Sequence, residues 1–164
     1  MTTAAHAAQT LVAAGAVWKY LDDGSDQASA WRFPQFDDAR WRAGPAQLGY
    51  GDGDEATVVG YGPNPNAKHI TTYFRHRFTV GDRNALTALT LALKRDDGAV
   101  VYLNGTEVYR SNMPSGTIAY DTRAVGTAAD DGATFEQAVI SIAPLVSGEN
   151  VLAVEVHQSS GASS

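Results

Sequence analysis

The stretch AVVYLNGTEVYR, residues 99–110, constrains the fold most strongly, because it has the form of two strands joined by a two-residue turn. Its central pair, Asn104-Gly105, suits a type I′ turn, in which both central residues take a positive φ. The flanking side chains are largely β-branched or aromatic, the residue types that favour strands. The segment therefore predicts an antiparallel β-hairpin.

Other segments repeat the strand signal, whereas helical periodicity is nearly absent. In ITTYFRHRFTV, Phe74 and His76 share one face and Tyr73 and Arg75 share the other. Several short strands without intervening helices indicate an all-β chain folded as an antiparallel β-sandwich. We expect the strands at residues 10–21, 70–80, 89–95, 133–142 and 151–158, with a short helical turn within 143–150.

Residues 22–69 form a long irregular stretch that is rich in Gly, Asn, Asp and Pro. So many turn residues predict surface loops, and a loop region of this length carries function or wraps the sandwich edge. We expect residues 11–164 to form one domain, preceded by a tail or cloning remnant at 1–10. That tail lacks a charged segment followed by an apolar one, which predicts no intact signal peptide.

Composition narrows the function. The formal net charge of −6 argues against binding to nucleic acid or to an anionic lipid surface, both of which need basic residues. No apolar run reaches the roughly 18 residues of a membrane span. The absence of cysteine excludes disulfides, thiolate nucleophiles and cysteine zinc sites.

Catalysis has no sequence support. Ser111, Ser115 and Ser141 stand in no Gly-x-Ser-x-Gly elbow. Vicinal acids point to different sides of an extended chain, whereas a glycosidase needs two carboxylates that face one bond. We therefore expect no independent enzymatic activity.

Four segments together resemble a family of bacterial extracellular modules with a galactose-binding-domain-like jelly roll: FDDARWRAGPAQLGYGDGDEATVV, YFRHRFTV, RDDGAVVYLNGTEVYRSNMPSG and GENVLAVEVHQ. The hairpin and the last segment are also similar to the sugar-binding jelly roll of family 2 glycoside hydrolases. Modules of this kind accompany phosphoesterase and lamin-tail domains in secreted proteins. The resemblance implies a non-catalytic accessory module that binds carbohydrate or cell-surface glycan outside the cell.

One departure from that family concerns the end of the sequence. In similar modules the strand ending VEVHQ is followed by a loop and a final strand, whereas here SSGASS follows. Without that strand we expect an open sheet edge beside residues 151–158 and an apolar groove. Three explanations remain open. The sequence is truncated, or the segment AAQTLVAAGAV takes the place of the missing strand, or a strand of another copy or domain does so. The last alternative predicts a structural subunit that docks or polymerises into a filament by strand complementation.

The pair Asp96-Asp97 before the hairpin resembles the aspartates that hold calcium in lectin domains of the protective-antigen type. Calcium needs six to eight oxygen ligands, so further ligands would come from residues 51–55 or from Asn112. In the other interpretation the two acids and Gly98 simply form a turn.

Galactose-binding-like folds also often carry a structural calcium in an early loop. The carboxylates that could supply its oxygens here are Asp22, Asp23, Asp26, Asp37 and Asp38. The alternative is that these residues form turns and cap short segments. Calcium is thus the one cofactor that the sequence predicts, as a structural ion.

Aromatic rings in loops at one end of a sandwich can stack on sugar rings. The predicted ligand-binding residues are Trp31, Tyr50, Tyr61, His69 and Tyr120. Trp18 and Trp41 are instead predicted to fill the core beneath the loops.

Overall fold

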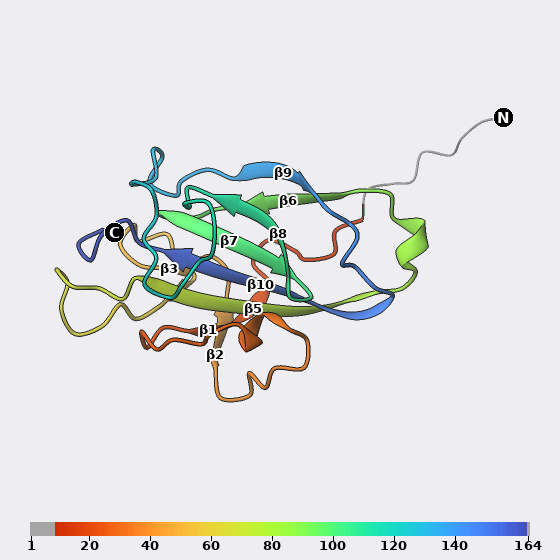
Figure 1. Cartoon of the computed structure of the whole chain (residues 1–164), viewed down its shortest axis with the longest axis horizontal. Helices are drawn as coiled ribbons and strands as arrows, with labels where there is room; N and C mark the ends of the chain where they lie inside the picture. The colour runs from red at the N-terminus through yellow and green to blue at the C-terminus, as the bar shows by residue number, and fades with distance from the viewer. Residues whose placement is uncertain (1–8, 164) are drawn as a thin grey trace.

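The computed structural model describes residues 9–163. Its main layer is a six-stranded sheet of order β2-β1-β5-β10-β7-β8, in which every pairing is antiparallel (Figure 1). The strands are β1 (Val17–Leu21), β2 (Arg42–Pro45), β5 (Thr71–Val80), β7 (Gly98–Leu103), β8 (Thr106–Ser111) and β10 (Gly148–His157).

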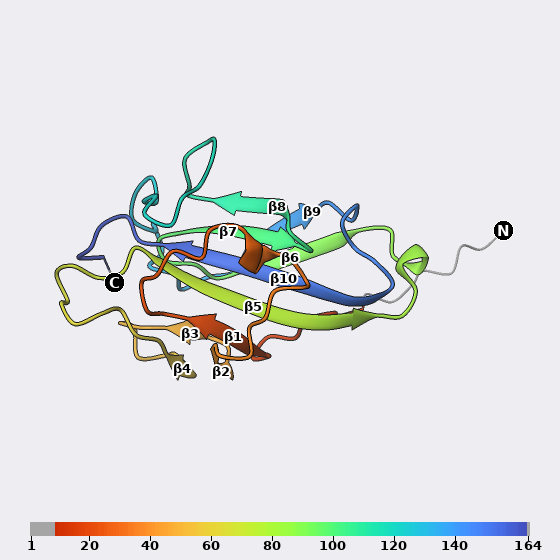
Figure 2. The same ribbon diagram turned by 60° about the horizontal axis from the view of Figure 1, so that its bottom comes forward.

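Short strand pairs make up the second layer. Antiparallel strands β6 (Leu89–Leu93) and β9 (Glu136–Ile140) form one pair, and parallel strands β3 (Leu48–Gly49) and β4 (Thr57–Val58) form the other. Figure 2 places β3 and β4 near β1 and β2, and β6 and β9 near β7 and β8. The all-β sandwich is therefore confirmed.

Helical structure is limited to two single turns of 3-10 helix, η1 (Ala30–Arg32) and η2 (Arg83–Ala85), within residues 9–163. In that same range no helix has the length and the apolar character needed to cross a membrane.

The hairpin forms as predicted. Asn104 and Gly105 have φ values of 51° and 89°, the positive values that a type I′ turn requires. The Asn104 side chain also links the turn to β10, because its Oδ1 accepts the backbone N–H of Val151 at 2.8 Å. The turn is thus fixed by its own chemistry and by the strand beside it.

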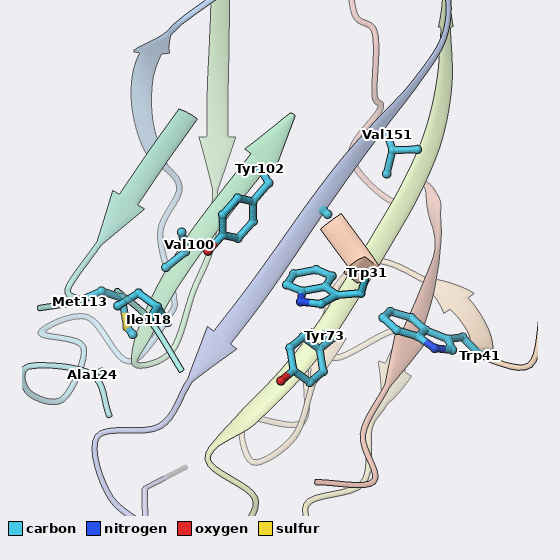
Figure 3. Close-up of a cluster of buried hydrophobic side chains, with 10 residues drawn as sticks. Trp31, Trp41, Tyr73, Val100, Tyr102, Met113, Ile118, Ala124 and Val151 are labelled. Atoms are coloured by element: carbon cyan, nitrogen blue, oxygen red, sulfur yellow. The ribbon is translucent and has the colours of Figure 1, made fainter. Parts of the chain in front are cut away.

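Apolar side chains pack on both faces of the main sheet. On β5, Phe74 belongs to the cluster that faces the second layer, whereas Tyr73 belongs to a cluster on the opposite face. Trp31 covers that opposite face; it is 0% exposed and its ring lies 4.8 Å from Tyr73 and 5.8 Å from Tyr102 (Figure 3). Trp41 is buried there too, as predicted. Part of the long irregular stretch therefore covers one sheet face.

Two local predictions are wrong. The first strand begins at Val17 instead of residue 10, because Gly15 has a φ of 81° and the Ala16 N–H donates to the Ala13 carbonyl in a turn. The last strand begins at Gly148 instead of residue 151, because pairing with β5 extends β10; the part of 143–150 before it holds one turn, in which the Leu145 N–H donates to the Ile142 carbonyl, and no helix.

The expectation of an open edge beside residues 151–158 is also wrong. β10 pairs with β5 on one side and with β7 on the other, so the edges of the main sheet are β2 and β8. The segment AAQTLVAAGAV adds no strand before Val17 within the described residues; Leu11 packs beside Val80 and Leu145 instead. Its first residues, 7 and 8, lie outside the described range.

Candidate functional site

A cleft of about 90 Å³ lies between β3 and the residues that follow β6. Phe74 of β5, Val156 of β10 and Val59 after β4 supply apolar lining, and Leu48 of β3 borders it. Pockets that enclose a drug-sized ligand measure about 300–1,000 Å³. This cleft therefore suits one edge of a ligand that remains largely in solvent.

Tyr50 lies at this cleft, and Tyr61, which is not part of the lining, packs against the Tyr50 ring. Tyr50 lines the cleft and meets Tyr61 edge to face at 5.0 Å, while the Lys68 ammonium lies 5.3 Å from the Tyr50 ring centre. Burial, with the nearby Asp96 carboxylate, raises the pKa of Tyr50 to about 12. The Tyr50 hydroxyl therefore stays protonated at neutral pH and can both donate and accept a hydrogen bond.

Gln158, directly after β10, also lines the cleft and is only 6% exposed. Its Oε1 is buried and has no hydrogen-bond partner among residues 9–163, while its Nε2 makes a long contact of 3.4 Å with the Asp96 carbonyl. An unsatisfied buried acceptor costs about 1–3 kcal/mol. A hydroxyl or ammonium group that reached Gln158 Oε1 would remove that cost.

Carboxylates dominate the polar wall of the cleft. Asp52, Glu55 and Asp96 line it, and the oxygens of Asp52, Asp54 and Glu55 lie within 4.8 Å of one another. Partial desolvation, together with the carboxylates of Asp131 and Glu55, raises the pKa of Asp52 above its usual value. The neighbouring carboxylates contribute to this shift after desolvation, and Lys94 opposes it.

The two cations at the cleft already have partners. Lys94 Nζ donates to Gln47 Oε1 at 3.0 Å and lies 3.8 Å from Asp54 Oδ2. Arg95 forms an ion pair with Glu136. Neither cation therefore stands ready to pair with an anionic ligand.

The pair Asp96-Asp97 is divided between two environments. Asp96 borders the cleft, so the structure brings it to the same lining as residues of the 51–55 loop, as the calcium hypothesis required. Asp97 is 1% exposed; its carboxylate accepts the Ser159 N–H and the Ser163 hydroxyl at 2.6 Å each and the Ala128 N–H at 3.0 Å. Asp97 therefore joins three segments of the chain.

Burial by itself would raise the pKa of Asp97, but the hydrogen bonds from Ser163, Ser159 and Ala128 outweigh it and lower the pKa. A carboxyl whose folded pKa is depressed stabilises the fold above its unfolded pKa of about 3.9 and loses that effect as the pH falls through the folded value. We expect Asp97→Asn to reduce the free energy of unfolding at pH 7 by about 2–3 kcal/mol. Urea unfolding between pH 7 and pH 3 measures this loss.

The same urea unfolding series also provides a control for the Asp97→Asn variant. The variant should also show a shallower loss of stability below about pH 4 than the unchanged protein, because its side chain does not titrate. The exposed residue Asp121 supplies the matched variant Asp121→Asn, which should unfold like the unchanged protein at each pH. Equal acid sensitivity of Asp97→Asn and the unchanged protein would contradict the structural role.

The predicted calcium ligands of the early loops have other contacts. Asp22 accepts the Gly60 N–H at 2.5 Å and pairs with Arg42 at 3.2 Å; Asp23 accepts the Ser25 hydroxyl at 2.6 Å. The Asp23 contact matches the turn that was the alternative to calcium, whereas the contacts of Asp22 join it to distant parts of the chain.

Asp26 and Asp37 accept hydrogen bonds within local turns, whereas Asp38 pairs with a distant strand. Asp26 accepts the Ala28 N–H at 2.7 Å, and Asp37 accepts the Ala39 N–H at 3.0 Å. Asp38 receives the Arg75 Nε–H at 2.8 Å. Calcium binding by the early acids stays a prediction, whereas the group of three acids that the described chain brings together is Asp52, Asp54 and Glu55.

The remaining predicted ligand residues lie apart from the cleft lining. Trp31 lies in the core. The His69 ring packs against Gly24 and Gly62, where an added Cβ would come within 2.6 Å and 2.8 Å of it. Tyr120 is 43% exposed, and its backbone carbonyl accepts the Thr71 hydroxyl. Of the five predicted residues, the structure brings Tyr50 and Tyr61 together.

A second polar group, which sequence patterns did not indicate, lies buried beneath η1. Glu155 is 2% exposed, accepts the Tyr102 hydroxyl at 2.6 Å and lies 3.5 Å from Arg32 Nη2. His157 Nε2 lies 3.4 Å from the same carboxylate. Burial, together with the Glu155 charge, raises the pKa of Tyr102. This group ties η1 to β7 and β10.

The sequence matches no known protein-family model, and no curated protein matches it. Solved structures do match. A β-glucuronidase from glycoside hydrolase family 2 aligns with 88% of this chain at 18% identity and a TM-score of 0.54, and the Bifidobacterium dentium β-glucuronidase aligns with 87% at 18% identity and 0.54. A β-glycosidase from Bacteroides vulgatus aligns with 91% at 17% identity and 0.53.

The matched region is a small part of each of these enzymes. The chain spans 13%, 19% and 17% of their respective lengths. At this level of identity the shared property is the fold, a β-sandwich like one found within family 2 glycosidases.

Proposed function

We propose that this chain is a non-catalytic accessory module of a secreted bacterial protein, and that it binds carbohydrate or cell-surface glycan at the cleft beside Tyr50. The observation that carries the proposal is Gln158, which lines the same cleft as the Tyr50 ring and whose buried Oε1 lacks a partner in residues 9–163. A sugar offers hydroxyl donors for Gln158 and an apolar C–H face for the Tyr50 ring. The small share of the matched glycosidases that the chain spans supports an accessory role.

The size of the cleft sets the expected affinity. A ligand efficiency of about 0.3 kcal/mol per non-hydrogen atom gives a single hexose of about twelve atoms roughly 4 kcal/mol, or a Kd of about 1 mM. The protein should therefore bind polysaccharides or clustered surface glycans through several weak contacts. A useful assay must detect millimolar binding.

We expect a glycan array to identify ligands, and Tyr50→Ala to weaken their binding by about tenfold or more, the effect of losing a stacking ring and a hydroxyl. Isothermal titration with the best oligosaccharide, in calcium and in EDTA, measures both the affinity and any dependence on calcium. Tyr120→Ala is the matched control, because it removes an exposed loop tyrosine that does not line this cleft. No binding across a broad panel would reject the proposal.

A second candidate function is docking by strand addition at β6. Among the described strands β6 pairs only with β9, and its half-buried Leu91 and Leu93 pack against the core cluster of Phe74 and Val154. An added strand on the free side of β6 would satisfy its backbone groups. Light scattering across a range of concentrations separates the two functions: oligomers that form while the glycan panel stays negative favour docking, and a monomer that binds glycan rejects it.

A further inference from the structure

We infer that the cleft selects glycans by charge: it takes sugars without a carboxylate, favours protonated amino sugars and rejects uronic acids. The inference rests on the proposed function and names its ligand class. It follows from which polar groups of the lining remain available to a ligand and which are already used.

The groups available to a ligand are mainly acceptors. Gln158 lines the cleft, and its buried Oε1 accepts no hydrogen bond from residues 9–163, so a ligand donor would have to displace the Gln158 side chain slightly to reach it; Asp52 lines the cleft with an exposed carboxylate. Tyr50 contributes a protonated hydroxyl. Sugar hydroxyls and an ammonium group donate to such acceptors, whereas a carboxylate can only accept.

The cations that a uronic acid would need are engaged. Lys94 Nζ contacts Gln47 Oε1 and Asp54, and it also lies 5.6 Å from the Phe135 ring centre. Arg95 Nε donates to Ser111 Oγ at 3.0 Å, and its Nη2 pairs with Glu136. A ligand carboxylate would have to break these contacts before it could be neutralised.

The local charge also opposes an anion. Six carboxylates stand in or beside the cleft against three cations, Lys68, Lys94 and Arg95, and the Lys68 ammonium already donates to the Ser163 carbonyl. The acids are Asp52, Asp54, Glu55, Asp96, Asp131 and Glu136. One carboxylate about 8 Å from a ligand charge changes affinity by about two- to thirtyfold, depending on the effective dielectric constant. We therefore expect about a tenfold difference between a neutral sugar and its uronate.

Three matched ligands test the inference on the full chain: methyl glucoside, the methyl glycoside of glucosamine, and methyl glucuronide. They are titrated at pH 6 and low ionic strength, where the amine is protonated and the uronate ionised. Two-dimensional NMR follows the shifts, including the Gln158 side-chain amide. The expected order of affinity is glucosamine, then glucoside, then glucuronide, and the differences should shrink at about 1 M salt, where the Debye length falls to about 3 Å.

Matched variants separate a local effect from net charge. Asp52→Asn removes one exposed carboxylate at the cleft and should narrow the gap between glucosamine and glucuronide by about two- to fivefold. Glu149→Gln removes one exposed carboxylate on β10, where it pairs with Arg77 outside the cleft lining, and should leave the gap unchanged. Equal effects of the two variants would overturn the inference, since net charge alone would then explain the order.

The remaining outcomes are also decisive. Glucuronide binding as tightly as glucoside overturns the charge selection while the glycan-binding function stands. Failure of methyl glucoside to bind at about 20 mM, well above the expected Kd of about 1 mM, also overturns it. If no glycan of the broad panel binds, the proposed function itself fails.

Discussion

Replacing Arg75 with alanine is expected to lower the free energy of unfolding by about 3–5 kcal/mol, the cost of breaking a buried ion pair from one side. The side chain is 0% exposed, its Nε donates to Asp38 at 2.8 Å, and its Nη1 donates to the carbonyls of Trp31 and Phe33. Alanine would leave the carboxylate and both carbonyls without this donor. Urea unfolding followed by tryptophan fluorescence measures the loss.

Arg77 provides the matched control, because it lies on the same face of the same strand two residues away. Its side chain is 36% exposed; it pairs with Glu149, which is 61% exposed, at 2.7 Å and donates to the carbonyls of Pro34 and Phe36. An exposed ion pair contributes about 0–1 kcal/mol and a hydrogen bond about 0.5–1.5 kcal/mol, so Arg77→Ala should cost less than the loss of the fully buried Arg75. Similar losses in the two variants would contradict the view that Arg75 fastens the irregular segment to the sheet.

Trp31→Ala is the second change with a large expected effect, a loss of about 3–5 kcal/mol in unfolding free energy. The ring is fully buried and packs edge to face on Tyr73 and Tyr102, so its removal leaves a cavity beneath η1 (Figure 3). Phe33→Ala is the control, since Phe33 is 45% exposed and should cost less than about 1 kcal/mol. Thermal and urea unfolding of the variants give the comparison.

The Trp31 variant also tests a functional prediction made from the sequence. If Trp31 is a core residue, the folded fraction of Trp31→Ala should keep the glycan affinity of the unchanged protein. A stable variant that loses affinity would return Trp31 to the ligand-binding residues.

Much of the strand arrangement could be predicted, because alternation is a local property. Phe74 and Tyr73 were assigned to opposite faces of β5, and they do pack in different clusters. Asn104-Gly105 determined its turn through backbone conformations that few residue pairs adopt. The start of the first strand was predicted wrongly. The positive φ of Gly15 places a turn there, so the extended strand begins only after it.

Burial on the second face of the sheet could not be predicted. Arg75 and Glu155 lie on the face of their strands that alternation predicts to be polar, yet they are 1% and 2% exposed. Strand periodicity identifies which side chains share a face, but an irregular segment that later covers that face leaves no periodic signal. The wrong expectation about the edge of β10 has a similar origin, because pairing partners are set by the path of the whole chain.

The candidate site likewise contains residues that the sequence indicated and residues that only the structure revealed. Tyr50 and the acids of residues 51–55 were recognisable as loop residues with ligand chemistry, but Gln158 had no motif to mark it. The sequence by itself determined the all-β class, the hairpin and the acidic character, since these depend on side-chain type and spacing along the chain. The tertiary structure alone decided that Gln158, Tyr50 and Asp96 line one cleft and that Asp97 is buried away from it. The physical reason is that β10 carries Gln158 between β5 and β7, and this long-range pairing brings distant segments together.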